Sequence, residues 1–88
     1  MHRNSALKVP GGKLLKASVE SDGAVIRKVR ICGDFFIHPE DSIERLEAAL
    51  KGAARADVRG IVERELADSR LYGVDVNSIV KVVWEALG

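Results

Sequence analysis

The chain has 88 residues, which fits one domain with a modest hydrophobic core and is too short for a deep active-site cleft of its own. Hydrophobic residues make up 47% of it, charged residues 31%, and the formal net charge is only +1, a composition typical of a globular domain. No run approaches the roughly 18 apolar residues of a membrane span, and residues 1–5 lead into no apolar signal core. These features predict a cytoplasmic protein.

Residues 1–88 are expected to form a single domain, of which residues 1–9 are a flexible N-terminal arm. From Leu14 to Cys32 apolar and polar residues alternate, which predicts a β-hairpin with Asp22-Gly23 in its turn. The spacing of Ile26, Val29 and Ile31 breaks the strict alternation of apolar and polar residues, so we expect a β-bulge near residues 27–28. A short third strand is predicted at residues 34–37.

After this strand the apolar period becomes that of a helix. Pro39 suits the first position of the first helix, because its missing N–H would have no partner there, and Gly52 ends that helix. A second helix contains Gly60, which costs about 1 kcal/mol relative to Ala. Gly73 closes the second segment.

The third helix is predicted over residues 76–87, with Asp75 as its N-terminal cap. The strands thus precede the helices along the chain. This order predicts an α+β fold, with a two- to three-stranded antiparallel sheet at the N-terminus followed by three helices packed on one face.

Charge is unevenly placed along the sequence. Residues 1–30 hold seven Lys or Arg against two acidic residues, a balance of +5, whereas the remaining 58 residues balance at −4. The first third therefore either faces an anionic partner, such as a nucleotide, a nucleic acid or an acidic protein surface, or is a solvated basic strand face, the commoner case.

The residues that could act in catalysis or bind a metal form no catalytic set. A single cysteine cannot make an internal disulfide, and one cysteine with two widely spaced histidines cannot make a zinc or iron–sulfur site. The position of Cys32 at the end of an apolar run predicts a buried, inert thiol. His38 has no nucleophile at catalytic spacing, and its simpler role is that of a residue at the entrance of the first helix. The loop "KVPGGK" could present Lys13 and backbone N–H groups to a phosphate, but its spacing is not that of a P-loop, so a simple turn is favoured.

Two adjacent phenylalanines stand in the stretch "CGDFFIHPED". Because neighbouring residues in a strand point to opposite faces, one of Phe35 and Phe36 is expected to fill the core. The other ring points away from the core, where the domain itself does not bury it. The sequence leaves open which ring is which.

The stretch "PGGKLLKASVESDGAVIRKVRICGDFFIHPEDSIERLEAAL" resembles the small C-terminal, or accessory, domain of lipoate-protein ligases. The likeness extends from about Lys8 onward and includes the entry "KVPGGKL", the charged hairpin and the tail "GVDVNSIVKVVWEAL". Its specific part is "GDFFIHPE" followed by an amphipathic helix.

Ligases of this family join lipoate to ATP, giving lipoyl-AMP and pyrophosphate, and pass the lipoyl group to a lysine of an acceptor domain. The resemblance implies an accessory subunit of a split, bipartite ligase, which forms a heterodimer with a catalytic large subunit and serves lipoyl-acceptor domains indirectly. Since the large domain is missing here, no catalytic residue carries over. The resemblance implies that this chain alone binds no cofactor and has no activity, and that the partner subunit binds lipoate, ATP and Mg²⁺.

On this reading a set of residues lies close to the partner or its nucleotide, with Lys13 directed toward ATP phosphates or an acidic surface and the outward phenylalanine as an apolar anchor. The set comprises Gly11, Gly12, Lys13, Asp34, Phe35, Phe36 and His38.

Two alternatives stay open. A nucleic-acid-binding module would use the basic hairpin and the "PGGK" loop, although both phenylalanines lie outside the basic stretch. A structural homodimer would form through the sheet edge or the helix that carries Trp84.

Overall fold

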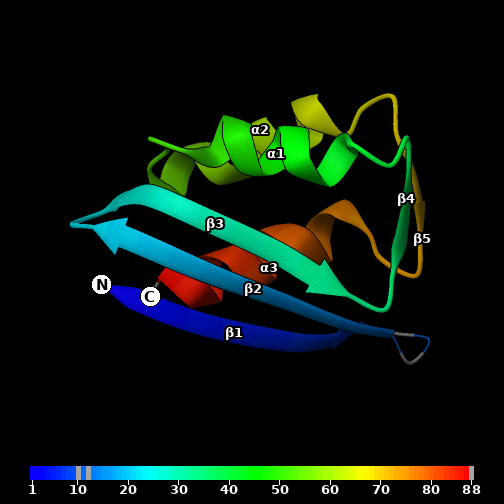
Figure 1. Ribbon diagram of the computed structural model, residues 1–88, viewed down its shortest axis with the longest axis horizontal. Coiled ribbons are helices and arrows are strands. Elements are labelled where there is room, and N and C mark those ends of the chain that lie inside the picture. Colours follow the sequence, from blue (N-terminus) through cyan, green and yellow to red (C-terminus); the bar gives the residue numbers. More distant parts are fainter. Residues whose placement is uncertain (10, 12, 88) are drawn as a thin grey trace.

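The computed structural model describes residues 1–9, 11 and 13–87 of the chain. Its main sheet is antiparallel, with the strands β1 (His2–Val9), β2 (Lys13–Asp22) and β3 (Val25–Gly33) in that order (Figure 1). The expected flexible arm at residues 1–9 is therefore wrong. β1 pairs with β2 along its whole length, and Val9 is buried at its end, which holds the segment in place.

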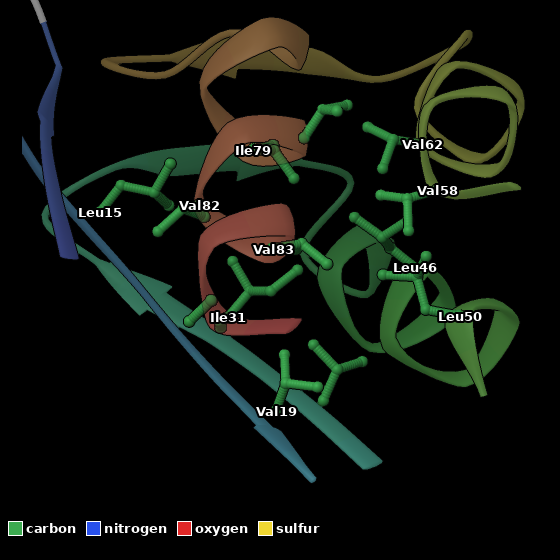
Figure 2. Packing of buried hydrophobic residues seen from close by; sticks show 14 of the residues in the cluster. Leu15, Val19, Ile31, Leu46, Leu50, Val58, Val62, Ile79, Val82 and Val83 are labelled. Carbon is green, nitrogen blue, oxygen red and sulfur yellow. The ribbon is translucent and has the colours of Figure 1, made fainter. Parts of the chain in front are cut away.

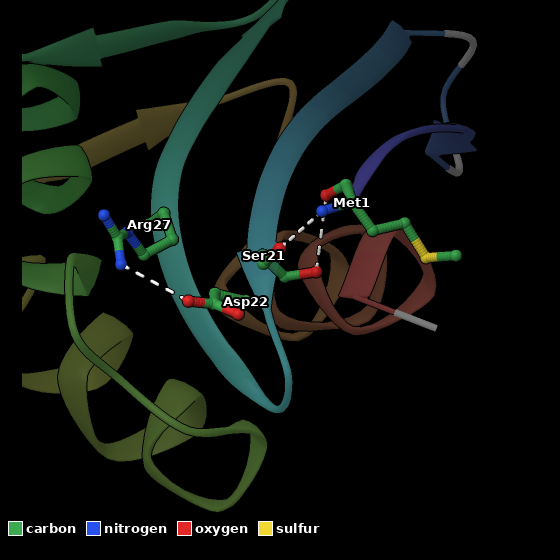
Figure 3. A network of polar contacts seen from close by, with 4 residues as sticks. All are labelled: Met1, Ser21, Asp22 and Arg27. Carbon is green, nitrogen blue, oxygen red and sulfur yellow. Dashed lines mark hydrogen bonds and ion pairs between the residues drawn. The ribbon is translucent and has the colours of Figure 1, made fainter.

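The pairing of β1 and β2 extends to the first residue. The Met1 amino nitrogen donates to the Ser21 carbonyl oxygen at 2.6 Å, and the Ser21 N–H donates to the Met1 carbonyl oxygen at 2.8 Å (Figure 3). These bonds align the beginning of β1 with the end of β2.

The predicted hairpin of β2 and β3 is confirmed. Gly23 in its turn has a φ of 63°, which a residue without a Cβ adopts without strain. Glu20 pairs with Lys28 but Ser21 pairs with Ile26, so Arg27 is the extra residue of a bulge, as the alternation predicts. Arg27 also forms an ion pair with Asp22 at 3.4 Å (Figure 3).

The predicted third strand forms at nearly the expected place but has a different partner. The strand β4 (Phe36–His38) pairs with β5 (Arg70–Tyr72) in a separate two-stranded ribbon, and not with the hairpin. β5 is absent from the sequence prediction because three residues between two helices show no measurable period. In the main sheet, the strand that joins the β2–β3 hairpin is β1 and not β4.

Three α-helices follow: α1 (Ser42–Leu50), α2 (Val58–Glu65), preceded by a 3₁₀ turn η1 (Arg55–Asp57), and α3 (Val76–Leu87). The first helix does not start at Pro39. Residues 39–41 form a turn in which the Pro39 carbonyl oxygen accepts the Ser42 N–H at 3.1 Å, so α1 begins later. The bounds of α3 agree with the prediction, and the Asp75 carboxylate accepts the Ser78 N–H at 2.7 Å as its cap.

The helices and the sheet enclose one hydrophobic core. α3 packs on β1 and β2 while α1 packs along β3, and within the part of the chain that the structure describes no helix lies over the opposite face of the sheet (Figure 1). Figure 2 shows Ile79 and Val82 of α3 between the sheet residue Leu15 and the α2 residue Val62, and all four are fully buried. The predicted α+β fold, a three-stranded antiparallel sheet followed by three helices, is confirmed.

The free edge of β3 is covered by the helical layer. The Glu47 carboxylate accepts the Ile31 N–H at 2.7 Å, and the Ile26 N–H donates to the Ala53 carbonyl oxygen at 2.9 Å. Glu47 of α1 therefore forms its hydrogen bond with β3. At the beginning of the same helix, Asp41 and Arg45 form an i,i+4 ion pair at 3.6 Å. Within the described residues, no helix is long and apolar enough to cross a membrane.

Candidate functional site

The end of β1, the beginning of β2 and the end of β3 lie at the same end of the main sheet, next to the β4–β5 ribbon (Figure 1). The Asp34 N–H donates to the Leu14 carbonyl oxygen at 2.9 Å, which joins the end of β3 to the beginning of β2. Gly33 makes this approach possible, because a Cβ at this position would lie 2.0 Å from the Leu14 carbonyl oxygen. Two segments twenty residues apart therefore form one surface.

Lys13 is held against a third segment at this end. A Cβ on Gly73, the residue after β5, would lie 2.8 Å from Lys13 Cγ, so the aliphatic stem of Lys13 crosses directly over Gly73. Gly73 has a φ of 79°, a conformation that favours glycine. The stem of Lys13 is thus packed against the protein, while the residue remains exposed. Gly11 lies in an exposed turn with a φ of 103°, and Gly12 lies outside the described residues.

The structure decides which phenylalanine points outward. Phe35 is half-buried and packs against the core, whereas Phe36 is 53% exposed. Ile37, the next residue in β4, is again buried. The strand alternation therefore places Phe36 and His38 on the outward face of the ribbon.

β5 supplies the other half of this outward face. Phe36 pairs with Tyr72 and His38 pairs with Arg70, and all four side chains are exposed. We call these four residues the ribbon face. The two rings lie with their centroids 6.1 Å apart at an interplanar angle of 47°, within the usual range for an aromatic pair. Sequence reasoning missed Arg70 and Tyr72, because no local period marks the strand that carries them.

A shallow depression of about 300 Å³ adjoins the ribbon. Phe35 and Phe36 form one part of its wall, Ile43 of α1 another, and Glu40 places a carboxylate at its border. The outward phenylalanine therefore stands next to a hollow that is partly apolar.

Three expectations for single residues change. Cys32 is exposed and not buried, because Ile31 takes the inward position of β3 and the following residue must point to the open face, opposite Lys16. His38 belongs to β4 and not to the entrance of a helix. The position of Asp34 after Gly33 predicts a side chain that accepts backbone N–H bonds in the turn, but the hydrogen bond that the structure gives Asp34 is donated by its own backbone N–H.

The open face of the sheet carries much of the positive charge of the first third. Lys16, Lys28 and Arg30 are exposed on it, and strands β1 to β3 contain no aromatic residue. Among the described residues, no group of three His, Cys, Asp or Glu side chains is arranged to hold a metal ion.

No protein-family model matches the chain. A stretch of 49 residues is 41% identical to lipoate-protein ligase A subunit 2 of Thermoplasma acidophilum, and covers 56% of this chain and 52% of that protein. The match therefore spans about half the length of the curated relative.

A solved structure gives a fuller likeness. It is described as a bi-partite lipoate protein ligase and its E2 lipoyl domain from Thermoplasma acidophilum, and one of its chains superposes on this protein with a TM-score of 0.87 and 28% identity. The superposition covers 94% of this chain and 94% of that chain. The resemblance to the accessory part of a split lipoate-protein ligase is thus confirmed.

Proposed function

We propose that this chain is the accessory subunit of a bipartite lipoate-protein ligase, required with a catalytic large subunit for the ATP-dependent activation of lipoate to lipoyl-AMP, and hence for protein lipoylation in the cytoplasm. The observation that carries the proposal is the likeness to a chain of a bi-partite ligase over 94% of both chains, with a TM-score of 0.87. Because the two chains match over nearly their whole lengths, the likeness concerns the entire fold and not a shared motif.

In this proposal the chemistry takes place on the partner. The catalytic subunit binds lipoate, ATP and Mg²⁺, and this chain supplies no catalytic residue and has no activity alone. Its contribution is to hold the partner's adenylate-forming site in an ordered, closed arrangement, which lowers the barrier by pre-organising the reactants. Lipoyl-acceptor domains are served indirectly, through the assembled ligase.

Lys13 is the residue that we place closest to the reaction. Its packed stem over Gly73 supports this assignment, because a cation with few accessible conformations loses little entropy when it meets an anionic group. That group is a phosphate of ATP or a carboxylate of the partner, and both require a positive charge at this end of the sheet. Asp34 and His38 flank the same region.

The test is reconstitution. The purified chain is mixed with a ligase large subunit that lacks a small domain of its own, and lipoate-dependent pyrophosphate release is followed. We expect the mixture to release pyrophosphate well above the rate of the large subunit, and the chain alone to release none. Equal rates with and without the chain would overturn the proposal. Salt-sensitive binding to a single-stranded oligonucleotide, without any effect on pyrophosphate release, would favour a nucleic-acid-binding module.

A further inference from the structure

The ribbon face concentrates exposed apolar surface at one place. Four large hydrophobic side chains of the described residues are exposed, and they are Met1, Val25, Phe36 and Tyr72. The last two are cross-strand partners on the ribbon, 53% and 52% exposed, with their rings in mutual contact. A single exposed ring is ordinary, but paired aromatic rings on one exposed face are typical of an interaction surface.

The ribbon is held in place from its other face. Ile37 of β4 is buried in the core, and Leu71 of β5 packs against the core. A two-stranded ribbon of three residues per strand is not stable by itself, so this anchoring fixes its position. The two rings are consequently presented on a fixed platform, and a partner that buries them pays little conformational entropy.

The charges beside the rings restrict what can cover them. The ribbon face contains Arg70 and His38 and no carboxylate, while Glu40 lies beyond it at the border of the adjoining depression. Two copies packed face to face through this surface would bring Arg70 close to Arg70 of the other copy. This arrangement is unfavourable, since like charges across an interface oppose association. A partner that carries carboxylates around an apolar recess fits better.

From these observations we propose that the ribbon face is the docking surface for the catalytic subunit, with Phe36 and Tyr72 inserted into an apolar recess of that subunit and Arg70 paired with a carboxylate at its rim. The proposal rests on the proposed function and adds the surface and the partner's chemistry to it. The position of the ribbon supports this choice of partner, because the ribbon lies at the same end of the molecule as Lys13 (Figure 1). One subunit seated there would cover the aromatic pair and come within reach of the lysine.

The variants Phe36→Ala and Tyr72→Ala remove one ring each, and Val25→Ala is the matched control. Val25 is also an exposed apolar strand residue, 39% exposed, but it begins β3 at the opposite end of the sheet (Figure 1). Binding to the large subunit is measured by titration calorimetry, and folding by circular dichroism. We expect each ring variant to raise the Kd about tenfold or more, as for central aromatic residues of interfaces, and the control to change it by less than about twofold.

A third variant covers the case in which a ring variant fails to fold. Arg70→Glu changes only an exposed side chain and reverses its charge, so it should leave the fold intact and raise the Kd, with a larger effect at low salt. Unchanged Kd values for folded ring variants and for Arg70→Glu would overturn the docking surface, while pyrophosphate release by the wild-type mixture would leave the proposed function standing. A wild-type homodimer that Phe36→Ala dissociates in sedimentation would also overturn it, in favour of a second copy. If the wild-type chain neither binds nor activates the large subunit, the proposed function fails first.

Discussion

Trp84 and Arg55 exchange two hydrogen bonds across the interface between α3 and the η1 turn. The indole N–H of Trp84 donates to the Arg55 carbonyl oxygen at 3.0 Å, and the Arg55 guanidinium donates to the Trp84 carbonyl oxygen at 3.1 Å. The same guanidinium lies 5.3 Å from the ring centroid, and that of Arg59 lies 5.7 Å from it. Trp84 thus connects the last helix to the η1 turn and to the beginning of α2.

Replacing Trp84 by Phe should lower the free energy of unfolding by about 1–2 kcal/mol, because the indole hydrogen bond is lost and the cation–π contact is weaker. Urea unfolding followed by far-ultraviolet circular dichroism measures this, since the substitution removes the chain's one tryptophan. Arg55→Gln is the control: it leaves the backbone acceptor of the indole in place and should cost less. A fully stable Trp84→Phe variant would contradict the assignment.

Gly33→Ala should be among the most destabilising substitutions in the chain. The new Cβ would lie 2.0 Å from the Leu14 carbonyl oxygen, a backbone atom that cannot move away without breaking the β2–β3 pairing. We expect a loss of at least about 2 kcal/mol in the free energy of unfolding. Gly52→Ala separates the clash from backbone strain, because Gly52 has a φ of 84° but open space around it. Equal losses for the two variants would show that the close approach is unimportant.

Gly60→Ala should have the opposite sign. Gly60 lies inside α2, and a Cβ there would meet nothing within 4 Å. Alanine is favoured over glycine in a helix by about 1 kcal/mol, so the variant should unfold at a higher urea concentration by a comparable free energy. Destabilisation would mean that α2 does not continue through this position.

Glu47 protects the edge of β3 by accepting the Ile31 N–H at 2.7 Å. Glu47→Ala leaves that N–H without its partner and should cost about 1–2 kcal/mol of stability, with a greater tendency to aggregate through the exposed edge. Glu47→Gln retains an acceptor oxygen and should keep most of the stability. Glu44→Ala, at an exposed position of the same helix, is the control and should change little. Unfolding free energies and light scattering of the three variants decide between these outcomes.

Lys13→Met preserves an aliphatic stem over Gly73 and removes the charge. In the reconstituted ligase we expect the rate of pyrophosphate release at low ATP to fall about tenfold or more, because a positive charge facing an anion is lost. A higher KM for ATP with unchanged subunit affinity would place the ammonium group at the phosphates, whereas a higher Kd between subunits would place it at a carboxylate. Unchanged KM, kcat and Kd would remove Lys13 from the site.

Gly73→Ala provides an independent check of the same cluster. Its Cβ would lie 2.8 Å from Lys13 Cγ and must displace that side chain, so activity should fall as in Lys13→Met. Gly23→Ala has the same backbone strain, with a φ of 63°, but lies far from Lys13 at the hairpin turn and should leave the specific activity of the folded chain unchanged. An equal loss of activity in both variants would indicate general destabilisation instead of a displaced lysine.

The sequence selects Gly11, Lys13, Asp34 and Phe36 as candidate site residues, and their role in binding stays a prediction. The structure joins the beginning of β2 to the end of β3 through the Asp34 N–H, and it sets Lys13 against Gly73 at the end of β5. The partners of these residues were not found: Gly73 beneath Lys13 and Tyr72 beside Phe36 come from a segment more than thirty residues further along the chain. Proximity of this kind has no signature in a local pattern, because it depends on how the helices return the chain to the sheet.

The sequence by itself determined the elements whose causes are local. The Asp-Gly turn, the bulge at Arg27 and the bounds of α3 follow from alternation, from the conformational freedom of glycine and from a capping carboxylate, and all three form as predicted. Only the tertiary structure decided that residues 2–9 complete the sheet, that β4 pairs with β5, and that Phe36 points outward while Phe35 packs inward. The physical reason is that a strand obtains its hydrogen bonds and its buried face from residues distant in sequence, so neither its partner nor its outward side is decided locally.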